Sequence, residues 1–252
     1  MVHVAVVQQT SGLEPDANRN LIAELTPDAA DLVVFPEAFA RDFGKAGSDL
    51  GASAESLDGP FVTEVERVAK ERDTTIVAGL FETSGDPDRP YNTLVMRGSA
   101  QADYRKIHLY DSFGYRESDR LSAGEIEPVL TEVGGLTVGL MTCYDLRFPE
   151  LSRLLVERGA DVLVVPAAWM AGDRKVDHWR TLVLARAIEN TAYVVAAAQP
   201  TPRYTGHSMV VDPRGDVLAE AGDGDEVITA VLDRDVLEEA RRTNPSLANR
   251  RM

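Results

Sequence analysis

The chain has 252 residues with 26 basic and 41 acidic side chains, giving a formal net charge of −15 at pH 7. A balance this acidic opposes nonspecific binding to nucleic acid and to anionic membranes, whose charge has the same sign. A chain of this length buries about three-quarters of its unfolded surface, which is enough for a substantial core. We therefore expect a globular protein with one domain over residues 1–252.

The single cysteine, Cys143, excludes an internal disulfide and leaves a free thiol, which favours a reducing, cytoplasmic location. The first ten residues lack a basic segment and have the pattern of a strand, so we expect no signal peptide. The longest apolar stretch, residues 162–171, is too short to span a bilayer.

The first half of the chain alternates between short apolar runs and helical patterns. Residues 40–59 are rich in Gly, Ser and Asp and predict a loop, and residues 107–128 predict a long polar connection. Strands are expected near residues 2–9, 31–35, 74–81, 91–97 and 100–106, and helices near 15–26 and 60–72.

The second half continues the alternation. Strands are expected near residues 136–142, 161–166, 192–198, 206–212, 216–220 and 226–232, and helices near 149–158, 176–190 and 233–242. Residues 243–252 form a tail. This order indicates a layered α/β fold, with two sheets packed together and helices outside them.

Cys143 lies where an apolar strand gives way to a helix whose first turn carries Pro149 and Glu150. Backbone N–H groups at such a junction can lower the pKa of a thiol and can bind a developing oxyanion. The alternative is an inert, buried cysteine, which is common in intracellular proteins.

Two other strands end in a charged side chain. Residues 31–36 are an apolar run that ends at Glu37, and an extended segment from residue 102 ends at Lys106. In α/β proteins, sites are built at the carboxyl ends of strands, so we expect both side chains to lie near Cys143. Each alone has an ordinary alternative, as a loop boundary or a solvated lysine.

Three short blocks carry this constellation: Phe35-Pro36-Glu37, Tyr104 to Leu109, and Cys143-Tyr-Asp-Leu-Arg-Phe-Pro-Glu150. In this order and spacing, the chain resembles the nitrilase superfamily of carbon–nitrogen hydrolases. The resemblance extends over residues 166–169, 179–190 and 206–215, and so covers nearly the whole chain. With Tyr144 directly after the cysteine, the chain resembles the amidase-like branches, including omega-amidase and deaminated-glutathione amidase, and not the true nitrilases.

The resemblance implies a four-layer αββα sandwich and a site made of Glu37, Lys106, Cys143 and Glu117. Glu37 is expected to act as general base, and Lys106 to stabilise the oxyanion together with the Tyr144 amide. Glu117 is expected to position Lys106, or to share proton transfer. Because unpaired buried charges are costly, these three charges should be paired with one another, with Cys143 neutral.

The expected reaction is hydrolysis of a small, anionic carboxamide through a cysteine thioester, which releases ammonia and a carboxylic acid. Hydrolysis of an N-carbamoyl amide or a nitrile would use the same residues. Acyl transfer to an amine and a catalytically silent binding or assembly module remain alternatives. The family also implies a homodimer or higher oligomer, formed through the long helix and the tail 243–252.

The remaining polar residues leave further alternatives. His108, His178 and His207 are candidate bases of a Cys–His hydrolase, although none lies in a motif that requires this role. The histidines are scattered without the spacing of metal ligands, so we expect no metal. The sequence has no phosphate-binding loop, so we expect no nucleotide cofactor.

Several side chains near the predicted site have two interpretations. Trp169 and Met170 either shape the pocket or simply pack. Arg147 is expected to form a salt bridge within the fold, with carboxylate recognition as the alternative. Arg174 and Lys175 are expected in a solvated loop, with an acidic substrate as the alternative partner.

Overall fold

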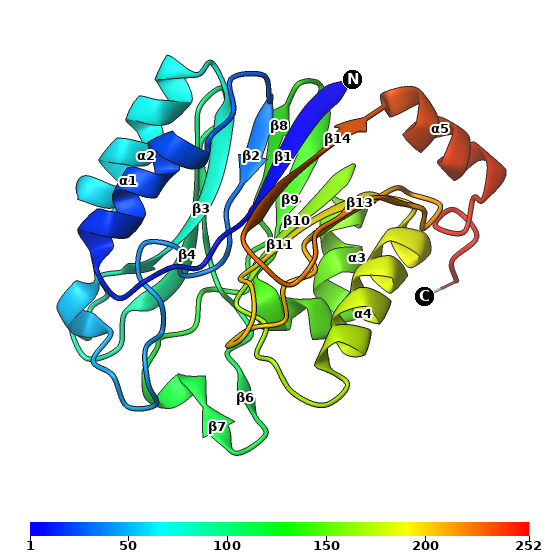
Figure 1. Cartoon of the computed structure of the whole chain (residues 1–252). Helices are drawn as coiled ribbons and strands as arrows, with labels where there is room; N and C mark the ends of the chain where they lie inside the picture. The colour runs from blue at the N-terminus through cyan, green and yellow to red at the C-terminus, as the bar shows by residue number, and fades with distance from the viewer. Residues whose placement is uncertain (252) are drawn as a thin grey trace.

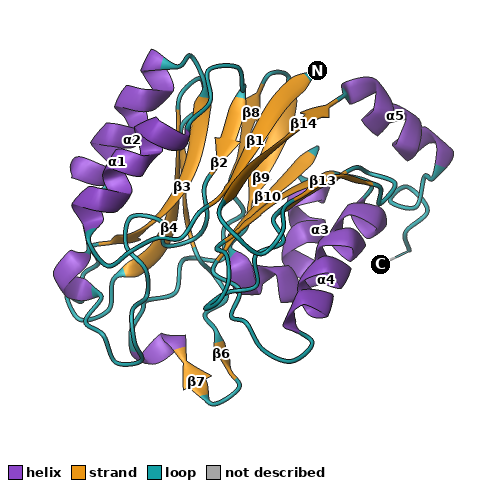
Figure 2. Cartoon of the chain, viewed as in Figure 1, coloured by secondary structure: helices purple, strands orange, loops and turns teal. Residues whose placement is uncertain are grey.

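Two six-stranded sheets pack face to face and carry helices on their outer faces (Figure 1). The computed structural model describes residues 1–251. Helices α1 (Pro15–Leu25) and α2 (Pro60–Glu71) cover one sheet, and α3 (Pro149–Glu157) and α4 (Lys175–Asn190) cover the other (Figure 2). The four-layer αββα sandwich implied by the family resemblance is therefore confirmed.

The first sheet has the strand order β14-β1-β2-β3-β4-β5. Its strands β1, β2 and β3 are parallel, and its other pairs are antiparallel. The bounds are β1 Val2–Gln8, β2 Leu32–Val34, β3 Thr75–Glu82, β4 Tyr91–Arg97, β5 Ala102–Arg105 and β14 Glu226–Leu232.

The second sheet has the order β13-β12-β11-β10-β9-β8, with β9, β10 and β11 parallel. The bounds are β8 Leu130–Val133, β9 Leu136–Leu140, β10 Val162–Ala167, β11 Tyr193–Ala198, β12 Met209–Val211 and β13 Val217–Glu220. Each sheet thus has a parallel centre, which places loops with functional side chains at one edge of the sandwich.

Local sequence explains where the helices begin. Helices α1, α2 and α3 each have proline in the first turn, where the missing N–H costs no hydrogen bond. Helix α5 (Arg234–Thr243) is capped by the Asp233 carboxylate, which accepts from the Asp235 amide at 2.9 Å. This helix lies at the opposite end of the molecule from the small hairpin of β6 (Asp111–Ser112) and β7 (Tyr115–Arg116) (Figure 1).

The main core lies between the two sheets. Val4 and Leu32 of the first sheet belong to the same buried cluster as Val164 and Val195 of the second. Strands β10 and β11 are buried at every residue, as expected for parallel strands with both faces covered. A second cluster, which includes Ile22 and Phe61, packs α1 and α2 onto the first sheet.

The polar connection after β5 has more structure than its composition predicts. It contains the two-stranded hairpin β6 (Asp111–Ser112) and β7 (Tyr115–Arg116), followed by a 3₁₀ turn over Glu117–Asp119. Strand β8 was also not predicted. Both misses have one cause, because strands of two to four residues are too short for a period-two pattern.

Within residues 1–251, no helix is both long and apolar enough to cross a membrane.

Gly79 on β3 leaves room for the backbone that carries Glu37. A Cβ at this position would lie 2.6 Å from Ala38 N and 3.0 Å from Glu37 Cα. We expect Gly79→Ala to lower the free energy of unfolding by about 1–3 kcal/mol, because the added methyl group overpacks the backbone. Denaturant unfolding measures this change.

Gly85→Ala is the matched control, since its Cβ would meet no heavy atom within 4 Å. We expect its effect to stay within about 0.5 kcal/mol. Equal stability of the two variants would contradict the proposed role of Gly79.

Candidate active site

Cys143 lies at a sharp turn after β9. It begins a 3₁₀ helix over Cys143–Arg147, and its φ is +46°. A residue other than glycine adopts this left-handed conformation only when its surroundings hold it there. The cysteine is 8 % exposed. The strand-to-helix junction predicted from sequence is therefore present, with the 3₁₀ turn inserted before α3.

Asp145 holds this turn against the segment that carries Lys106. Its fully buried carboxylate accepts hydrogen bonds from Thr142 N at 2.8 Å and from Tyr104 Oη at 2.6 Å. His108 Nδ1 lies 2.7 Å from the same carboxylate. His108 thus makes a structural contact, and among residues 1–251 no histidine lines the cavity next to Cys143.

Arg186 of α4 supports the turn from behind. Its Nε and Nη2 atoms donate to Leu146 O at 3.1 and 2.7 Å, and its side chain is buried. A charge-assisted contact of this kind fixes the orientation of the 3₁₀ turn.

Lys106 forms a buried ion-paired cluster with Glu37 and Glu117. Its Nζ lies 2.9 Å from Glu37 Oε1, and 2.9 and 3.1 Å from the two oxygens of Glu117. All three side chains are at most 2 % exposed. The structure thus brings together the four residues expected to form the site, since all line one cavity with Cys143.

Neutral groups complete the hydrogen bonding of the two carboxylates. Asn92 Nδ2 donates to Glu37 Oε1 and Ala168 N donates to Glu37 Oε2, both at 2.7 Å. Tyr110 N donates to Glu117 Oε2 at 2.6 Å. The sequence analysis missed Asn92, although an asparagine inside a strand is uncommon enough to be a signal. The amide of Ala168 gives no such signal.

The surroundings shift the pKa values of Lys106, Glu117 and Cys143. Burial opposes the charge on Lys106, but Glu117 and Glu37 outweigh it and raise the pKa of the amine well above its usual range. Burial raises the pKa of Glu117. Burial and the Glu37 charge raise the pKa of the Cys143 thiol well above its usual range. The resting cysteine is therefore a neutral thiol beside a carboxylate.

The Tyr144 amide lies beside this thiol, at the second residue of the 3₁₀ helix. The first amides of a helix have no acceptor within it, so they are available to a ligand. Trp169 follows β10, which pairs in parallel with β9, and its ring lines the cavity. Both residues expected near the oxyanion or the substrate therefore border the same space.

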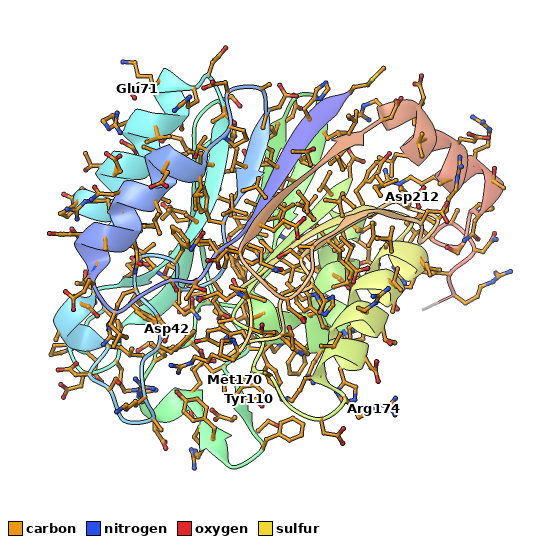
Figure 3. All side chains as sticks on the ribbon, in the orientation of Figure 1. Asp42, Glu71, Tyr110, Met170, Arg174 and Asp212 are labelled. Atoms are coloured by element: carbon orange, nitrogen blue, oxygen red, sulfur yellow. The ribbon has the colours of Figure 1, made fainter. Side chains whose placement is uncertain are left out.

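The cavity has a volume of about 370 Å³, within the range of small-molecule sites. Its outer wall is aromatic, with Tyr110, Phe113 and Tyr115 contributed by the β6–β7 hairpin and the segment before it. Tyr110 and Met170, which are labelled in Figure 3, both line the cavity.

Four cationic side chains besides Lys106 line the cavity, and they differ in their partners. Arg203 pairs with Asp42 at 3.0 Å, and Arg120 donates to Tyr115 Oη at 2.8 Å. Arg120, Arg147 and Lys175 pair with no carboxylate among residues 1–251. The salt bridge expected for Arg147 is therefore absent from the described structure.

Arg147 lies with its guanidinium carbon 4.8 Å from the centre of the Trp169 ring. Its Nε and Nη2 atoms are buried and have no hydrogen-bond partner. Buried donors without partners are rare in proteins, and at a cavity wall they mark a place for an acceptor.

Within residues 1–251, no group of three or more His, Cys, Asp or Glu side chains could hold a metal ion.

Comparison with known proteins identifies the family. The carbon-nitrogen hydrolase model matches residues 3–242. The chain belongs to the carbon–nitrogen hydrolase family. It is 42 % identical over 237 residues to a deaminated glutathione amidase of Escherichia coli, which covers 92 % of this chain and 89 % of the relative.

Two further proteins are similar over most of their length. A 2-oxoglutaramate amidase of Paenarthrobacter nicotinovorans is 37 % identical, covering 88 % of this chain and 79 % of the relative. Saccharomyces cerevisiae Nit3, a member of branch 10 of the nitrilase superfamily, superposes with a TM-score of 0.88 at 29 % identity, covering 100 % of this chain and 97 % of Nit3. The carbon–nitrogen hydrolase is thus an amidase acting on carbon–nitrogen bonds other than peptide bonds.

Replacing Glu37 tests two of its expected effects, one on the pKa of the Cys143 thiol and one on turnover as a general base. We expect Glu37→Gln to lower the pKa of Cys143, because the charge that raises it is removed while Lys106 remains. We also expect turnover to fall by about 10²–10⁴-fold, as for the loss of a general base. Titrating the ultraviolet absorbance of the thiolate reports the pKa, since Cys143 is the only cysteine.

Glu132→Gln is the control, because Glu132 is an exposed carboxylate on β8. It should change neither the thiol pKa nor the turnover. If Glu37→Gln also leaves the thiol pKa and the turnover unchanged, Glu37 neither raises the pKa of Cys143 nor acts as its base.

Proposed function

We propose that the enzyme hydrolyses the carboxamide of a small anionic acid through a thioester on Cys143. The observation that supports this proposal most directly is that the buried Cys143 shares one cavity with the ion-paired Glu37 and Lys106. A thiol with a raised pKa needs a base at the moment of attack, and the Glu37 carboxylate lines the same cavity.

In the proposed first step, the Cys143 sulfur attacks the carbonyl carbon as Glu37 takes the thiol proton. The carbonyl oxygen becomes an oxyanion, which accepts from the Lys106 ammonium and from the Tyr144 amide. Loss of one such donor typically slows a reaction by about 10²–10³-fold. Glu37 then returns the proton to nitrogen as the carbon–nitrogen bond breaks, and ammonia leaves.

In the second step, water attacks the thioester after transferring a proton to Glu37. Collapse of this intermediate releases the carboxylic acid, and the proton returns to the sulfur. Glu117 holds Lys106 through two contacts of 2.9 and 3.1 Å and is bound by Tyr110 N. These contacts favour a positioning role for Glu117 over proton transfer.

The unpartnered donors of Arg147 are the reason for proposing an anionic substrate. Its two buried, unpartnered N–H donors lie four residues after the nucleophile and border the cavity. A carboxylate presents two acceptors in the matching geometry. Relatives named as amidases of 2-oxoglutaramate and of deaminated glutathione, both anionic amides, are consistent with this choice.

The test is intact-mass spectrometry of the wild type and Cys143→Ala after brief mixing with substrate and acid quench. The panel pairs anionic and neutral carboxamides, with an N-carbamoyl acid and a nitrile as rival substrates. We expect an adduct equal to substrate minus ammonia on the wild type only, and only with the anionic carboxamides.

Two results would contradict the proposed hydrolysis. If no anionic carboxamide gives an adduct or releases ammonia while iodoacetamide still labels Cys143, the hydrolytic proposal is wrong. An adduct that persists when Cys143 is replaced would contradict the assigned nucleophile.

We further propose that two copies associate in the cytoplasm through the outer face of α4 and the tail 243–252. The family resemblance supports this arrangement, as does Ile188, which is 48 % exposed on α4. We expect sedimentation equilibrium to give twice the mass of one chain, and Ile188→Lys to shift the protein toward the monomer. A monomeric wild type would refute the dimer.

A further inference from the structure

We propose that Asn92 is a positioning residue for the reaction. Its amide fills one acceptor position of Glu37, so that the catalytic proton is taken up at Oε2 and the base stays ionised to lower pH. This inference rests on the proposed role of Glu37 as general base. Asn92 does not line the cavity, so it acts through Glu37 and not on the substrate.

Asn92 occupies a position where the strand pattern calls for an apolar side chain. Residues two apart on a strand share one face. Leu94 and Met96, which follow Asn92 on its face of β4, belong to the core between the two sheets. Asn92 itself is 1 % exposed. Burying an amide costs free energy unless its polar atoms are hydrogen-bonded, so a polar residue in this row requires an explanation.

The two polar atoms of the Asn92 amide differ in their partners. Nδ2 donates to Glu37 Oε1 at 2.7 Å, whereas Oδ1 is buried and has no hydrogen-bond partner among residues 1–251. The reverse orientation would place Oδ1 against Glu37 Oε1, with two acceptors facing each other, so Asn92 serves the carboxylate as a donor only. A buried acceptor without a partner costs stability. The contact with Glu37 is therefore the reason for an amide at this position.

Asn92 also holds the other member of the ion pair. Its backbone carbonyl accepts from Lys106 N at 2.8 Å, directly after the end of β5. The side chain of the same lysine returns to Glu37, where Nζ lies 2.9 Å from Oε1. Asn92 thus fixes the carboxylate of Glu37 and the main chain of Lys106 at once, and Oε1 has one neutral and one cationic donor.

The donors around Glu37 leave one acceptor position open. An ionised carboxylate has about four such positions, two on each oxygen. Oε1 accepts from Asn92 and Lys106, and Oε2 accepts from Ala168 N at 2.7 Å. The open position is on Oε2, and the proton of the Cys143 thiol moves there as sulfur attacks. Without the Asn92 amide, a second position opens on Oε1, away from this path.

A neutral donor suits this position of Glu37. The titratable groups that interact with the Glu37 charge are Lys106, Glu117, Cys143 and Tyr204. Hydrogen bonds to the charged form of a carboxylate favour that form, and a cation favours it more strongly. A second cation beside Lys106 would make Glu37 too weak a base, whereas no donor at all would let it take up a proton at higher pH. A protonated Glu37 cannot accept the thiol proton.

The test measures the rate at which iodoacetamide alkylates Cys143 as a function of pH. The sulfur displaces iodide as its proton moves to Glu37, so the rate reports proton removal without any hydrolysis. Cys143 is the only cysteine, and intact mass therefore counts one site. We expect the wild-type rate to rise with pH along an acid limb as Glu37 ionises. Glu37→Gln should lose this limb, which identifies the group that causes it.

Asn92→Leu removes the donor and keeps a side chain of similar size. We expect it to move the acid limb to higher pH by about one unit, as for the loss of a hydrogen bond to a charged group. At a pH below both limbs, alkylation is then about tenfold slower than in the wild type. Asn92→Asp keeps the shape and puts a second carboxylate at Glu37, so it should move the limb further. Denaturant unfolding checks that both variants are folded.

Asn190→Leu is the matched control. Asn190 is also buried, its Oδ1 also lacks a partner, and its Nδ2 donates to the neutral Ser152 Oγ at 3.3 Å and Arg186 O at 2.9 Å. This variant should leave the acid limb at its wild-type pH.

Three results would overturn the inference. An acid limb that stays at its wild-type pH in both Asn92 variants would show that the amide is merely structural. An equal shift in Asn190→Leu would show that the shift does not depend on the contact with Glu37. An acid limb that persists in Glu37→Gln would assign the limb to another group. If the limbs move as expected while no carboxamide is hydrolysed, the positioning role stands and the proposed hydrolysis fails, which is a separate result.

Discussion

The ion-paired cluster of Glu37, Lys106 and Glu117 is the interaction on which the site depends. Removing a carboxylate or an ammonium from water costs several kcal/mol, so each of these charges requires the others. The structure meets the cost with three contacts to Lys106 and with donors from Asn92, Ala168 and Tyr110. Burial raises the pKa of the adjacent Cys143 thiol and the Glu37 charge raises it further, which explains why the thiol stays protonated.

This cluster also fixes the two sheets relative to each other. Glu37 follows β2 of the first sheet, but its Oε2 accepts from Ala168, which follows β10 of the second. Its backbone carbonyl accepts from Gln199 Nε2 at 3.0 Å, just beyond β11. An apolar interface between sheets tolerates small shifts, whereas a buried carboxylate does not, because a lost donor leaves an unpaired acceptor. The polar contacts therefore define the relative position of the sheets, and the valine-rich core supplies most of the burial.

The layered fold and the location of the site were predictable from sequence because each depends on a local pattern. An apolar run that ends in Glu37, Lys106 or Cys143 is visible in a few residues, and parallel strands bring such ends together. The contacts of Arg147 were not predictable. An arginine in an acidic chain is expected to find a carboxylate, and its lack of one depends on the position of every acidic residue in the fold. The same holds for Lys175, whose neighbour Phe113 lies in a hairpin too short to be recognised and whose neighbour Tyr110 directly precedes that hairpin.

The net charge of −15 describes the whole chain, and the cavity has a different balance. Among residues 1–251 its only carboxylates are Glu37 and Glu117, which Lys106 partly neutralises. The lining cations Arg120, Arg147 and Lys175 have no carboxylate partner there. At physiological ionic strength, exposed charges more than about 8 Å away are largely screened, while charges at a cavity wall are not. An anionic substrate is therefore repelled weakly by the distant acidic surface and attracted strongly at the site. The acidic composition and an anionic substrate are compatible for this reason, and the distribution of charge is more informative about the ligand than its sum.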